Sequence, residues 1–303
     1  MDETCESDLQ AAYKYCDVLI IGAGPAGISC ALWLTRLGIQ AWVLEAADAV
    51  GGLCLHNDLA GGWEANAPMA TGLDTAKALA QTIALHHIPV LLQQRVSQIH
   101  AQGQHYCVHS LDSEGGWHVY HTRFVVLATG VCAKGLPEVA LPHPNIWVGP
   151  GNHIWAQNVA GKKIAVLGGG DNAFENAVWL AEQGAEVEIY ARHVRAQPLW
   201  QARFGPEQVH VGACDLQAAS LGVNGKTYDA WAVFYGWQAC VPTGLGVALD
   251  ARGFIASDAQ GLTSWPRVYA IGEVTQKQHP CIATAMAEGV VAAKAIANTL
   301  ACE

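Results

Sequence analysis

The stretch DVLIIGAGPAGISCALWLTRLGIQAWVLEAA, residues 17–47, decides the fold. Its apolar run Val18–Ile21 predicts a short buried strand, and a glycine-rich turn follows directly. Apolar residues then recur at helical spacing, which predicts a helix that stops at Gly38, and Gln40–Leu44 predicts a second buried strand. This order of strand, glycine turn, helix and strand is typical of a dinucleotide-binding unit.

The glycines of the turn stand in the order G-x-G-x-x-G at Gly22, Gly24 and Gly27. The first glycine permits a tight turn, the second lets a pyrophosphate approach the backbone, and the third lets helix and strand touch. The helix N-terminus then faces the phosphates. Glu45 ends the second strand, where a carboxylate can accept hydrogen bonds from a ribose diol. An ordinary tight strand–helix turn is the alternative interpretation.

The same order of elements returns at residues 162–192, in KKIAVLGGGDNAFENAVWLAEQGAEVEIYAR. Here the turn has the form G-x-G-x-x-A at Gly168, Gly170 and Ala173, and alanine still permits close helix–strand packing. One chain therefore contains two predicted dinucleotide-binding units.

The second unit lacks an acidic residue at the end of its second strand. Arg192 and Arg195 follow that strand, and no acidic residue occurs from Tyr190 to Gly205. Arginines in place of a carboxylate favour a ribose 2′-phosphate, hence NADP over NAD. A solvated basic loop is the alternative interpretation.

The segments outside these two units read mainly as short strands. Pro89–Ile99, His105–Leu111 and Trp117–Leu127 predict strands, and the DSEGG turn between the last two predicts a hairpin. Three later strands and a final helix are expected at residues 209–213, 230–237, 267–274 and 282–300.

Composition and charge limit the classes of protein that fit. A chain of 303 residues that is 51% hydrophobic can bury a substantial core and is expected to form about two domains. The formal charge of −10 argues against nucleic acid or an anionic membrane as the main partner. The N-terminus is acidic and glycines interrupt the apolar run Val18–Leu34, so we expect neither a signal peptide nor a membrane span, and a cytoplasmic location.

The chain has ten cysteines, and none forms a Cys-x-x-Cys pair. Their spacing excludes the usual zinc motif and the local redox dithiol, and the histidines show no metal spacing. We therefore expect mostly reduced thiols in packed positions and no metal site.

Five motifs occur in a characteristic order: GAGPAG at 22–27 with Glu45, GG at 51–52, ATG at 128–130, GGGDNA at 168–173 and YAIGEV at 269–274. This order resembles that of the two-dinucleotide flavoprotein reductases over nearly the whole chain. The chain is most similar to the low-molecular-weight thioredoxin reductases and the thioredoxin-reductase-like ferredoxin–NADP reductases. The phrase IATAMAEG at 282–289 is especially like the second branch.

The resemblance implies an α/β fold with two Rossmann-like, three-layer ββα domains, the second inserted into the first. Residues 1–130 and 241–303 are expected to bind FAD, and residues 131–240 are expected to bind NADPH. The family also implies a homodimer.

The family's FAD contacts carry over to positions that match its motifs. Gly22–Gly27 are expected to hold the pyrophosphate, Glu45 the adenosine ribose, and Glu273, where the family has aspartate, the ribityl chain. The start of the last helix is expected to face the flavin and to stabilise its reduced form. The expected FAD-binding residues are Gly22, Gly24, Pro25, Ala26, Gly27, Glu45, Ala46, Gly51, Gly52, Leu53, Val96, Ala128, Thr129, Gly130, Gly272, Glu273, Cys281, Ile282 and Ala283. The expected NADP-binding residues are Gly168, Gly170, Asp171, Asn172, Ala173, Arg192 and Arg195.

The redox dithiol of thioredoxin reductases is missing. Its place is taken by Gly151–Ile154, and because disulfide exchange needs thiolates, ordinary thioredoxin reduction is disfavoured. Cys54, His153 and Cys281 are the candidate catalytic residues. The sequence stops at Glu303, short of the flavin-covering tail of the ferredoxin–NADP reductase branch. The flavin face is therefore expected to be either open or covered by another group, for which His153 and Trp155 are the candidates.

The resemblance implies an FAD-dependent oxidoreductase that passes hydride from NAD(P)H to flavin N5 and electrons onward to a small redox protein. The second domain is short for the family, so a ferredoxin-linked flavoprotein that ignores pyridine nucleotides is an alternative. A small flavin monooxygenase is another alternative. Gly149 and His153 have the separation of the glycine and histidine in F-x-G-x-x-x-H-x-x-x-W, the fingerprint of Baeyer–Villiger-type flavin monooxygenases. From another class, a flavin-binding sensor or interaction protein also stays open.

Overall fold

The computed structural model describes residues 14–58, 63–136 and 143–303. The chain divides into two compact units, one made of Met1–Val131 with Ala239–Glu303 and the other of Cys132–Gln238. Where the chain passes between them, β7 (Val131–Ala133) and β16 (Trp237–Ala239) pair as a small sheet. Within the described residues, no helix is long and apolar enough to cross a membrane.

The larger unit is built on a parallel sheet. Strand β1 lies between β2 and β6, and the register pairs Ile20 with Val43 on one side and with Val126 on the other. The strands follow the order β3 (Val90–Leu91), β2 (Ala41–Leu44), β1 (Lys14–Ile21) and β6 (Trp117–Leu127), and β17 (Val268–Ala270) pairs with the end of β6.

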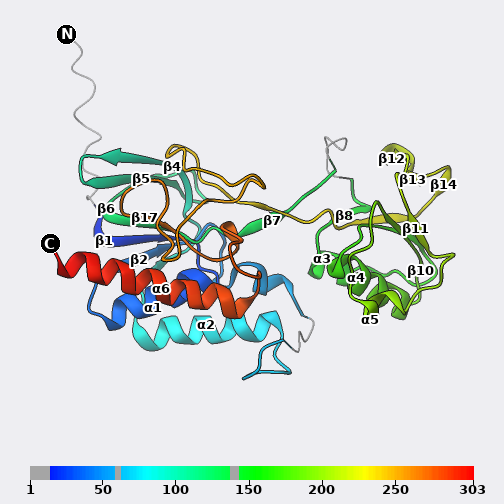
Figure 1. The fold of residues 1–303 in the computed structure, drawn as a ribbon, viewed down its shortest axis with the longest axis horizontal. Helices are drawn as coiled ribbons and strands as arrows, with labels where there is room; N and C mark the ends of the chain where they lie inside the picture. The colour runs from blue at the N-terminus through cyan, green and yellow to red at the C-terminus, as the bar shows by residue number, and fades with distance from the viewer. Residues whose placement is uncertain (1–13, 59–62, 137–142) are drawn as a thin grey trace, which may run out of the picture. The chain divides into compact units, whose positions relative to one another are not determined.

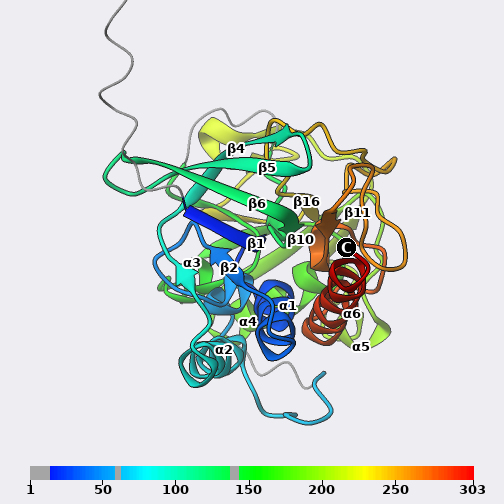
Figure 2. The same cartoon turned by 90° about the vertical axis from the view of Figure 1, so that its left-hand side faces the viewer.

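The side chains of β1 alternate between two cores, as the pleat of a strand requires. Val18 and Ile20 pack with the helices, whereas Leu19 and Ile21 pack on the opposite face of the sheet. Figures 1 and 2 show helices α1 (Pro25–Arg36), α2 (Gly72–His86) and α6 (Ile282–Ala301) on one face of the sheet. The predicted strand, glycine turn and helix are thus confirmed.

An antiparallel meander forms the other layer of this unit. It consists of β4 (Arg95–Gln102), β5 (His105–Leu111) and the first part of β6, and the predicted hairpin is present. The prediction of one strand over Pro89–Ile99 is wrong, because Gln93 adopts a left-handed φ of 56°. This turn lets β3 join the parallel sheet while β4 starts the meander.

The smaller unit has its own parallel sheet and one long helix. The strand order is β11 (Val209–Val211), β10 (Glu186–Ala191), β9 (Lys163–Leu167), β15 (Ala230–Val233) and β8 (Ile146–Val148), and α4 (Asp171–Glu182) joins β9 to β10. The prediction of one strand over residues 230–237 is wrong. Gly236 has a φ of 88°, so the chain turns there and then forms β16.

Three two-residue strands form a further sheet that the sequence analysis missed. They are β12 (Leu216–Gln217), β13 (Gly222–Val223) and β14 (Lys226–Thr227). Val223 packs with Tyr190 and Trp231 of the parallel sheet, so this small sheet covers the face opposite α4. Short helical turns complete the chain: η1 (Gly52–His56), α3 (Asn152–Trp155), α5 (Pro198–Gln201), η2 (Ala218–Ser220) and η3 (Gly272–Val274).

The predicted fold class is therefore confirmed. Each unit has a central parallel sheet with helix on one face and antiparallel strands on the other, and the smaller unit lies within the sequence of the larger. In both units the glycine turn follows the central strand directly, at the carboxyl end of the sheet where ligands bind in such folds.

A polar network joins the small sheet to the parallel sheet. The Glu188 carboxylate accepts hydrogen bonds from His210 Nε2 at 2.6 Å, Lys226 Nζ at 2.8 Å and the Tyr190 hydroxyl at 3.1 Å. Burial alone would raise the pKa of Glu188, but the hydrogen bonds from Lys226, His210 and Tyr190 outweigh it and lower the pKa to about 2.

We expect Glu188→Gln to make the stability of the smaller unit less dependent on acid pH. A carboxylate whose pKa is lowered by folding stabilises the protein above its ordinary pKa, and that contribution is lost as pH falls toward 2. As the pH is lowered from about 6 to about 2, the melting temperature should therefore fall less for the variant than for the wild type. Parallel curves would contradict this prediction.

Candidate functional site

A cavity of about 620 Å³ lies in the larger unit at the carboxyl end of its parallel sheet. Its wall is formed by the glycine turn, the end of β2, η1, the end of β6, η3 and the start of α6. All of the predicted FAD-binding residues line it except Gly27, Gly51 and Ala283. The structure thus gathers residues from both ends of the chain around one space.

The three glycines of the first turn play different steric parts. A Cβ on Gly22, which has a φ of 107°, would lie 2.3 Å from the carbonyl oxygen of Ala128, and one on Gly27 would lie 2.0 Å from that of Gly22. Both therefore serve close packing of the turn. A Cβ on Gly24 would meet nothing within 4 Å, and Gly24 lines the cavity. Its backbone is thus open to a ligand.

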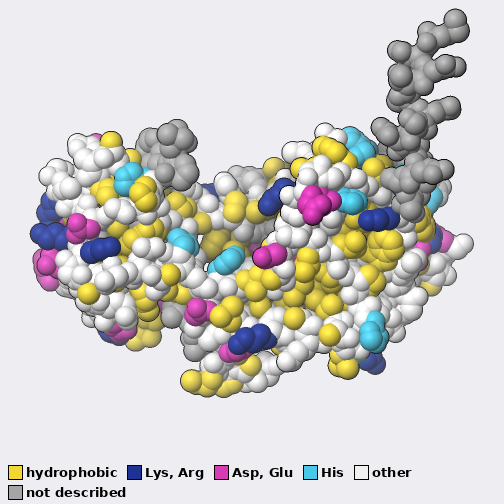
Figure 3. Space-filling model, turned by 180° about the vertical axis from the view of Figure 1, so that it is seen from behind, with side chains coloured by type: hydrophobic (Ala, Val, Ile, Leu, Met, Phe, Trp, Pro, Cys, Tyr) yellow, Lys and Arg dark blue, Asp and Glu magenta, His cyan; other side chains and the backbone are white. Residues whose placement is uncertain are grey.

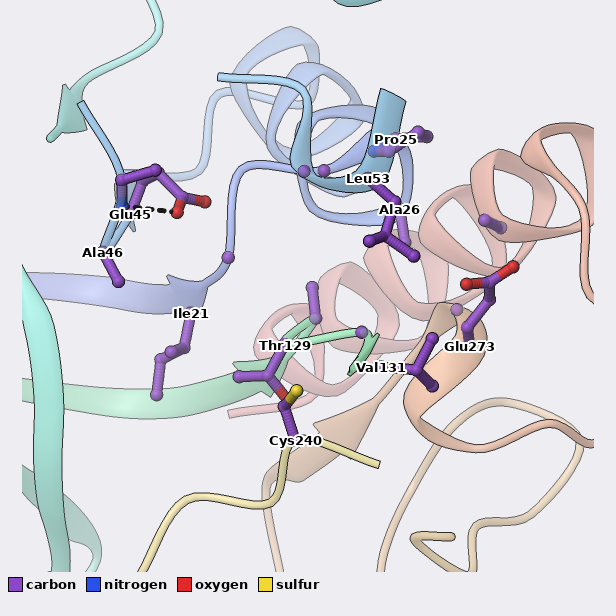
Figure 4. A pocket seen from close by; sticks show the side chains of 18 of the residues that line it. Ile21, Pro25, Ala26, Glu45, Ala46, Leu53, Thr129, Val131, Cys240 and Glu273 are labelled. Atoms are coloured by element: carbon purple, nitrogen blue, oxygen red, sulfur yellow. Dashed lines mark hydrogen bonds between the residues drawn. The ribbon is translucent and has the colours of Figure 1, made fainter. Parts of the chain in front are cut away.

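Glu45 holds its carboxylate at the end of β2, beside this turn. One oxygen accepts a hydrogen bond from Ala23 N at 2.7 Å and the other from Ala47 N at 2.8 Å. Figure 4 shows Glu45 and Glu273 on opposite sides of the cavity. Since each carboxylate oxygen has a second lone pair, Glu45 can still accept hydrogen bonds from a ribose.

The start of α6 forms another part of the wall. Cys281 caps this 20-residue helix, and both Cys281 and Ile282 line the cavity. The first N–H groups of a helix have no partner within it and carry a partial positive charge. The long helix therefore presents hydrogen-bond donors and positive potential at the cavity.

Thr129, in the turn that follows β6, carries a polar atom without a partner among the described residues. Its Oγ1 is buried and makes no hydrogen bond with the described residues, although the residue lines the cavity. A buried hydroxyl usually has a hydrogen-bond partner. Together with the open backbone at Gly24 and the fixed carboxylate of Glu45, this hydroxyl fits a cavity shaped for a polar ligand such as FAD.

The candidate catalytic residues have different settings. Cys54 and Cys281 line the cavity, whereas His153 belongs to α3 in the smaller unit and is exposed. Burial, reinforced by the charges of Glu64 and Glu273, raises the pKa of Cys54 to about 11. Cys54 is thus a neutral thiol at neutral pH and a poor nucleophile.

Several lining residues were missed by the sequence analysis. Cys240 and Pro242 enter the wall where the chain returns from the smaller unit, Gln94 enters it between β3 and β4, and Arg95 enters it at the start of β4. No motif marks these positions, because they depend on tertiary structure. A return segment beside the ATG turn at residues 128–130 is the one signal that could have pointed to Cys240.

The second glycine turn repeats the steric pattern of the first. A Cβ on Gly168 would lie 2.6 Å from the carbonyl oxygen of Phe234, and one on Gly169 would lie 2.0 Å from that of His193. A Cβ on Gly170, by contrast, would meet nothing within 4 Å. Gly170 therefore exposes its backbone at the N-terminus of α4, as Gly24 does at that of α1.

The basic segment after β10 is fastened to this turn. Arg195 N donates to the Gly169 carbonyl at 2.6 Å, and the Asp171 carboxylate accepts hydrogen bonds from the backbone and side chain of Gln197. Arg192 and Arg195 are both exposed. The predicted NADP-binding residues thus come together at one end of the smaller sheet.

The position of the missing dithiol is occupied by α3. Trp155 on this short helix donates to the Asn176 side chain and packs against Trp179, so it belongs to the core of the smaller unit. All the cysteines in the described residues are free thiols, and no three metal-binding side chains of those residues converge on one point.

Comparisons with known proteins agree with this architecture. The chain is 29% identical to a component of the alkyl hydroperoxide reductase of Pseudomonas putida over 92% of its own length and 57% of that protein. It is 32% identical to a ferredoxin–NADP reductase of Granulibacter bethesdensis over 68% of its own length and 57% of that protein. The chain thus spans little more than half the length of these curated relatives.

The fold has solved counterparts. Lactococcus lactis thioredoxin reductase superposes with a TM-score of 0.78 over 95% of this chain and all of that one, at 23% sequence identity. The model of the pyridine nucleotide-disulphide oxidoreductase family matches residues 16–207, which is more than half of the chain. The protein therefore belongs to the pyridine nucleotide-disulphide oxidoreductase family.

Proposed function

We propose that this protein is an FAD-dependent oxidoreductase that takes hydride from NAD(P)H and passes electrons to a redox partner without a local dithiol. The observation that carries the proposal is the open backbone at Gly24, which lines one cavity together with Glu45 and the α6 N-terminus. When bound, FAD supplies an acceptor for hydride and a donor of single electrons or pairs.

The protein's own residues would bind and orient the cofactor. The backbone at Gly24 and the start of α1 would receive the diphosphate, and Glu45 would hold the adenosine ribose. The α6 N-terminus would favour negative charge on the ligand atoms that face it. Thr129 Oγ1 would gain the hydrogen bond that it lacks.

NADPH is the proposed donor because the second glycine turn has an open glycine, as the first does, and exposed arginines beside it. Gly170 would admit a pyrophosphate, and Arg192 and Arg195 would pair with a 2′-phosphate. The ferredoxin-linked alternative is favoured by one observation, the reduction of the third layer to strands of two residues. An anaerobic titration separates these two functions.

We expect NADPH to bleach the FAD-loaded protein anaerobically at a lower concentration than NADH does. Replacing both Arg192 and Arg195 by alanine should raise the NADPH requirement by about 100-fold or more and leave that for NADH nearly unchanged, since each lost charge-assisted hydrogen bond costs about 1.5–3 kcal/mol. If reduced ferredoxin bleaches the protein and neither nucleotide does, the electron donor is ferredoxin and not NADPH.

The proposed acceptor is a small redox protein, and the proposed assembly is a homodimer. The FAD cavity lies in the unit with most of the acidic residues of a chain whose net charge is −10. Figure 3 shows Lys and Arg side chains in small separate groups on the face drawn there. A protein partner is therefore favoured over nucleic acid.

A further inference from the structure

A pair of carboxyl groups beside the FAD cavity has no part in the proposed hydride transfer. Glu288 on α6 accepts hydrogen bonds from Gly272 N at 2.7 Å and from the Thr275 hydroxyl at 3.5 Å. These contacts fasten η3 to α6, and η3 carries Glu273. A Cβ on Gly272, which has a φ of 75°, would lie 2.9 Å from Ala26 Cβ, so α1 confines η3 from the other side.

Glu273 is thereby fixed at the cavity wall without a hydrogen-bond partner. It lines the cavity, is partly buried, and makes no hydrogen bond or ion pair with the described residues. Burial raises the pKa of Glu273, because the protein offers its carboxylate nothing in exchange for water. The remaining stabilisation of its charge comes from water in the cavity.

A small void is lined by Glu273 together with residues of α6 and of the segment 276–280. Its volume is about 10 Å³, the room of about one water molecule, and both Glu273 and Glu288 line it. The polar side chains Gln276, Gln278, His279 and Thr284 complete its wall. The two carboxyl-bearing residues and the exposed segment 278–280 thus line one water-sized space.

Burial is the cause that raises the pKa of Glu273, and no nearby titratable group of the described residues offsets it. Among the titratable residues that line the cavity or the void with Glu273, Cys54 lies in η1, Cys281 at the start of α6 and Glu288 within α6. Glu64 acts together with Glu273 on the pKa of Cys54. Lys277 Nζ lies 4.0 Å from a carboxylate oxygen of Glu288, and burial raises the pKa of Glu288 despite this lysine. His279 borders the void and is exposed.

We propose that FAD binding is coupled to the uptake of one proton, which is held on the Glu273 carboxyl and exchanged with solvent through the void that Glu288 borders. The inference rests on the proposed function, since it takes FAD as the ligand. FAD displaces water that stabilises the Glu273 carboxylate and adds the negative charge of its diphosphate. The carboxylate therefore takes a proton from the buffer, and the carboxyl that results can donate a hydrogen bond to the ligand.

The coupling has a defined sign. A group whose pKa rises on binding takes up protons between its free and bound pKa values. FAD affinity should be constant at low pH and then fall by up to about tenfold per pH unit through that interval. Two variants at position 273 distinguish the effect of the proton from that of side-chain length. Glu273→Asp keeps a titratable carboxyl on a shorter side chain, whereas Glu273→Gln keeps the length and cannot titrate.

The test is calorimetric titration of the FAD-depleted full chain with FAD in buffers of different ionisation enthalpy, which counts the protons taken up. We expect uptake in the wild type, less in Glu273→Asp, and none in Glu273→Gln, which should bind FAD with a flat pH profile. Glu64→Gln removes a carboxylate whose charge raises the pKa of Cys54 and is not among the causes that raise the pKa of Glu273. It serves as the matched control and should keep the uptake.

The outcomes distinguish this inference from the proposed function. FAD binding without proton uptake, or equal uptake by wild type and Glu273→Gln, overturns the inference and leaves the function standing. Failure of the wild type to bind FAD at all overturns both. Glu288→Gln tests the void separately, because it should slow proton exchange seen by infrared measurement of the Glu273 carboxyl while FAD affinity stays within about threefold.

Discussion

Replacing Gly24 by alanine will leave a folded chain that loses most of its affinity for FAD. A Cβ at this position meets no protein atom within 4 Å, so the methyl group points into open space at the cavity wall. That space is where the diphosphate would approach the backbone. One or two lost backbone-to-phosphate hydrogen bonds correspond to an affinity about 10- to 100-fold lower.

The stability of the FAD-free chain should hardly change. Gly24 is the N-cap of α1 with a φ of −77°, which alanine adopts freely, and it makes no side-chain capping bond. Loss of a good N-cap residue costs about 1 kcal/mol at most here. FAD affinity is read from titration of the depleted protein by absorbance, and stability from thermal unfolding of the same sample.

The other glycines supply the matched controls. Gly170→Ala should keep FAD and lose bleaching by NADPH, since a Cβ there is equally open but lies in the other unit. Gly22→Ala should unfold the turn, because its Cβ would lie 2.3 Å from a carbonyl oxygen. Unchanged FAD affinity in Gly24→Ala would contradict the proposed binding of the diphosphate at the backbone of Gly24.

The motifs predicted the site better than the periodicity predicted the elements. G-x-G-x-x-G fixes a steric pattern within a few residues, so the sequence alone located the open position at Gly24 and the closely packed position at Gly27. The break at Gln93 depends on which of two sheets each half of a segment joins, and the apolar pattern is compatible with either. Local sequence carries no information on that choice.

Parts of the cavity wall were invisible for a related reason. Cys240 and Gln94 reach the cavity through the return of the chain and the turn between β3 and β4, so their positions follow from tertiary structure. The hydrogen bond from Gly272 N to the Glu288 carboxylate joins residues that lie sixteen positions apart on different elements. The two-residue strands β12, β13 and β14 are too short for any periodic pattern to show.

A second large effect is expected at Gly289, in the middle of α6. Alanine in place of glycine normally stabilises a helix by about 1 kcal/mol. Here the added Cβ would lie 2.5 Å from Ala26 O and 2.8 Å from Cys30 N, both backbone atoms of α1. A flexible side chain could move aside, but a helix backbone cannot, so the sign of the effect is reversed.

We expect Gly289→Ala to destabilise the larger unit by about 2–3 kcal/mol, as overpacking of a core does, and to lower its melting temperature by about 5–10 °C. The hydrogen bond from Ser29 Oγ to Met286 O, at 2.8 Å, ties the same two helices and would be strained by their separation. Val291→Ala on the exposed side of α6 is the control and should be nearly neutral.

The two glycine variants together test how the fold builds the site. Gly24→Ala should lose FAD while the FAD-free chain keeps its stability, whereas Gly289→Ala should lose stability first and FAD as a consequence, because α1 carries Ala26 at the cavity wall. Added FAD should therefore raise the melting temperature of Gly289→Ala but not that of Gly24→Ala. If FAD stabilises both variants equally, the diphosphate does not bind at the backbone of Gly24.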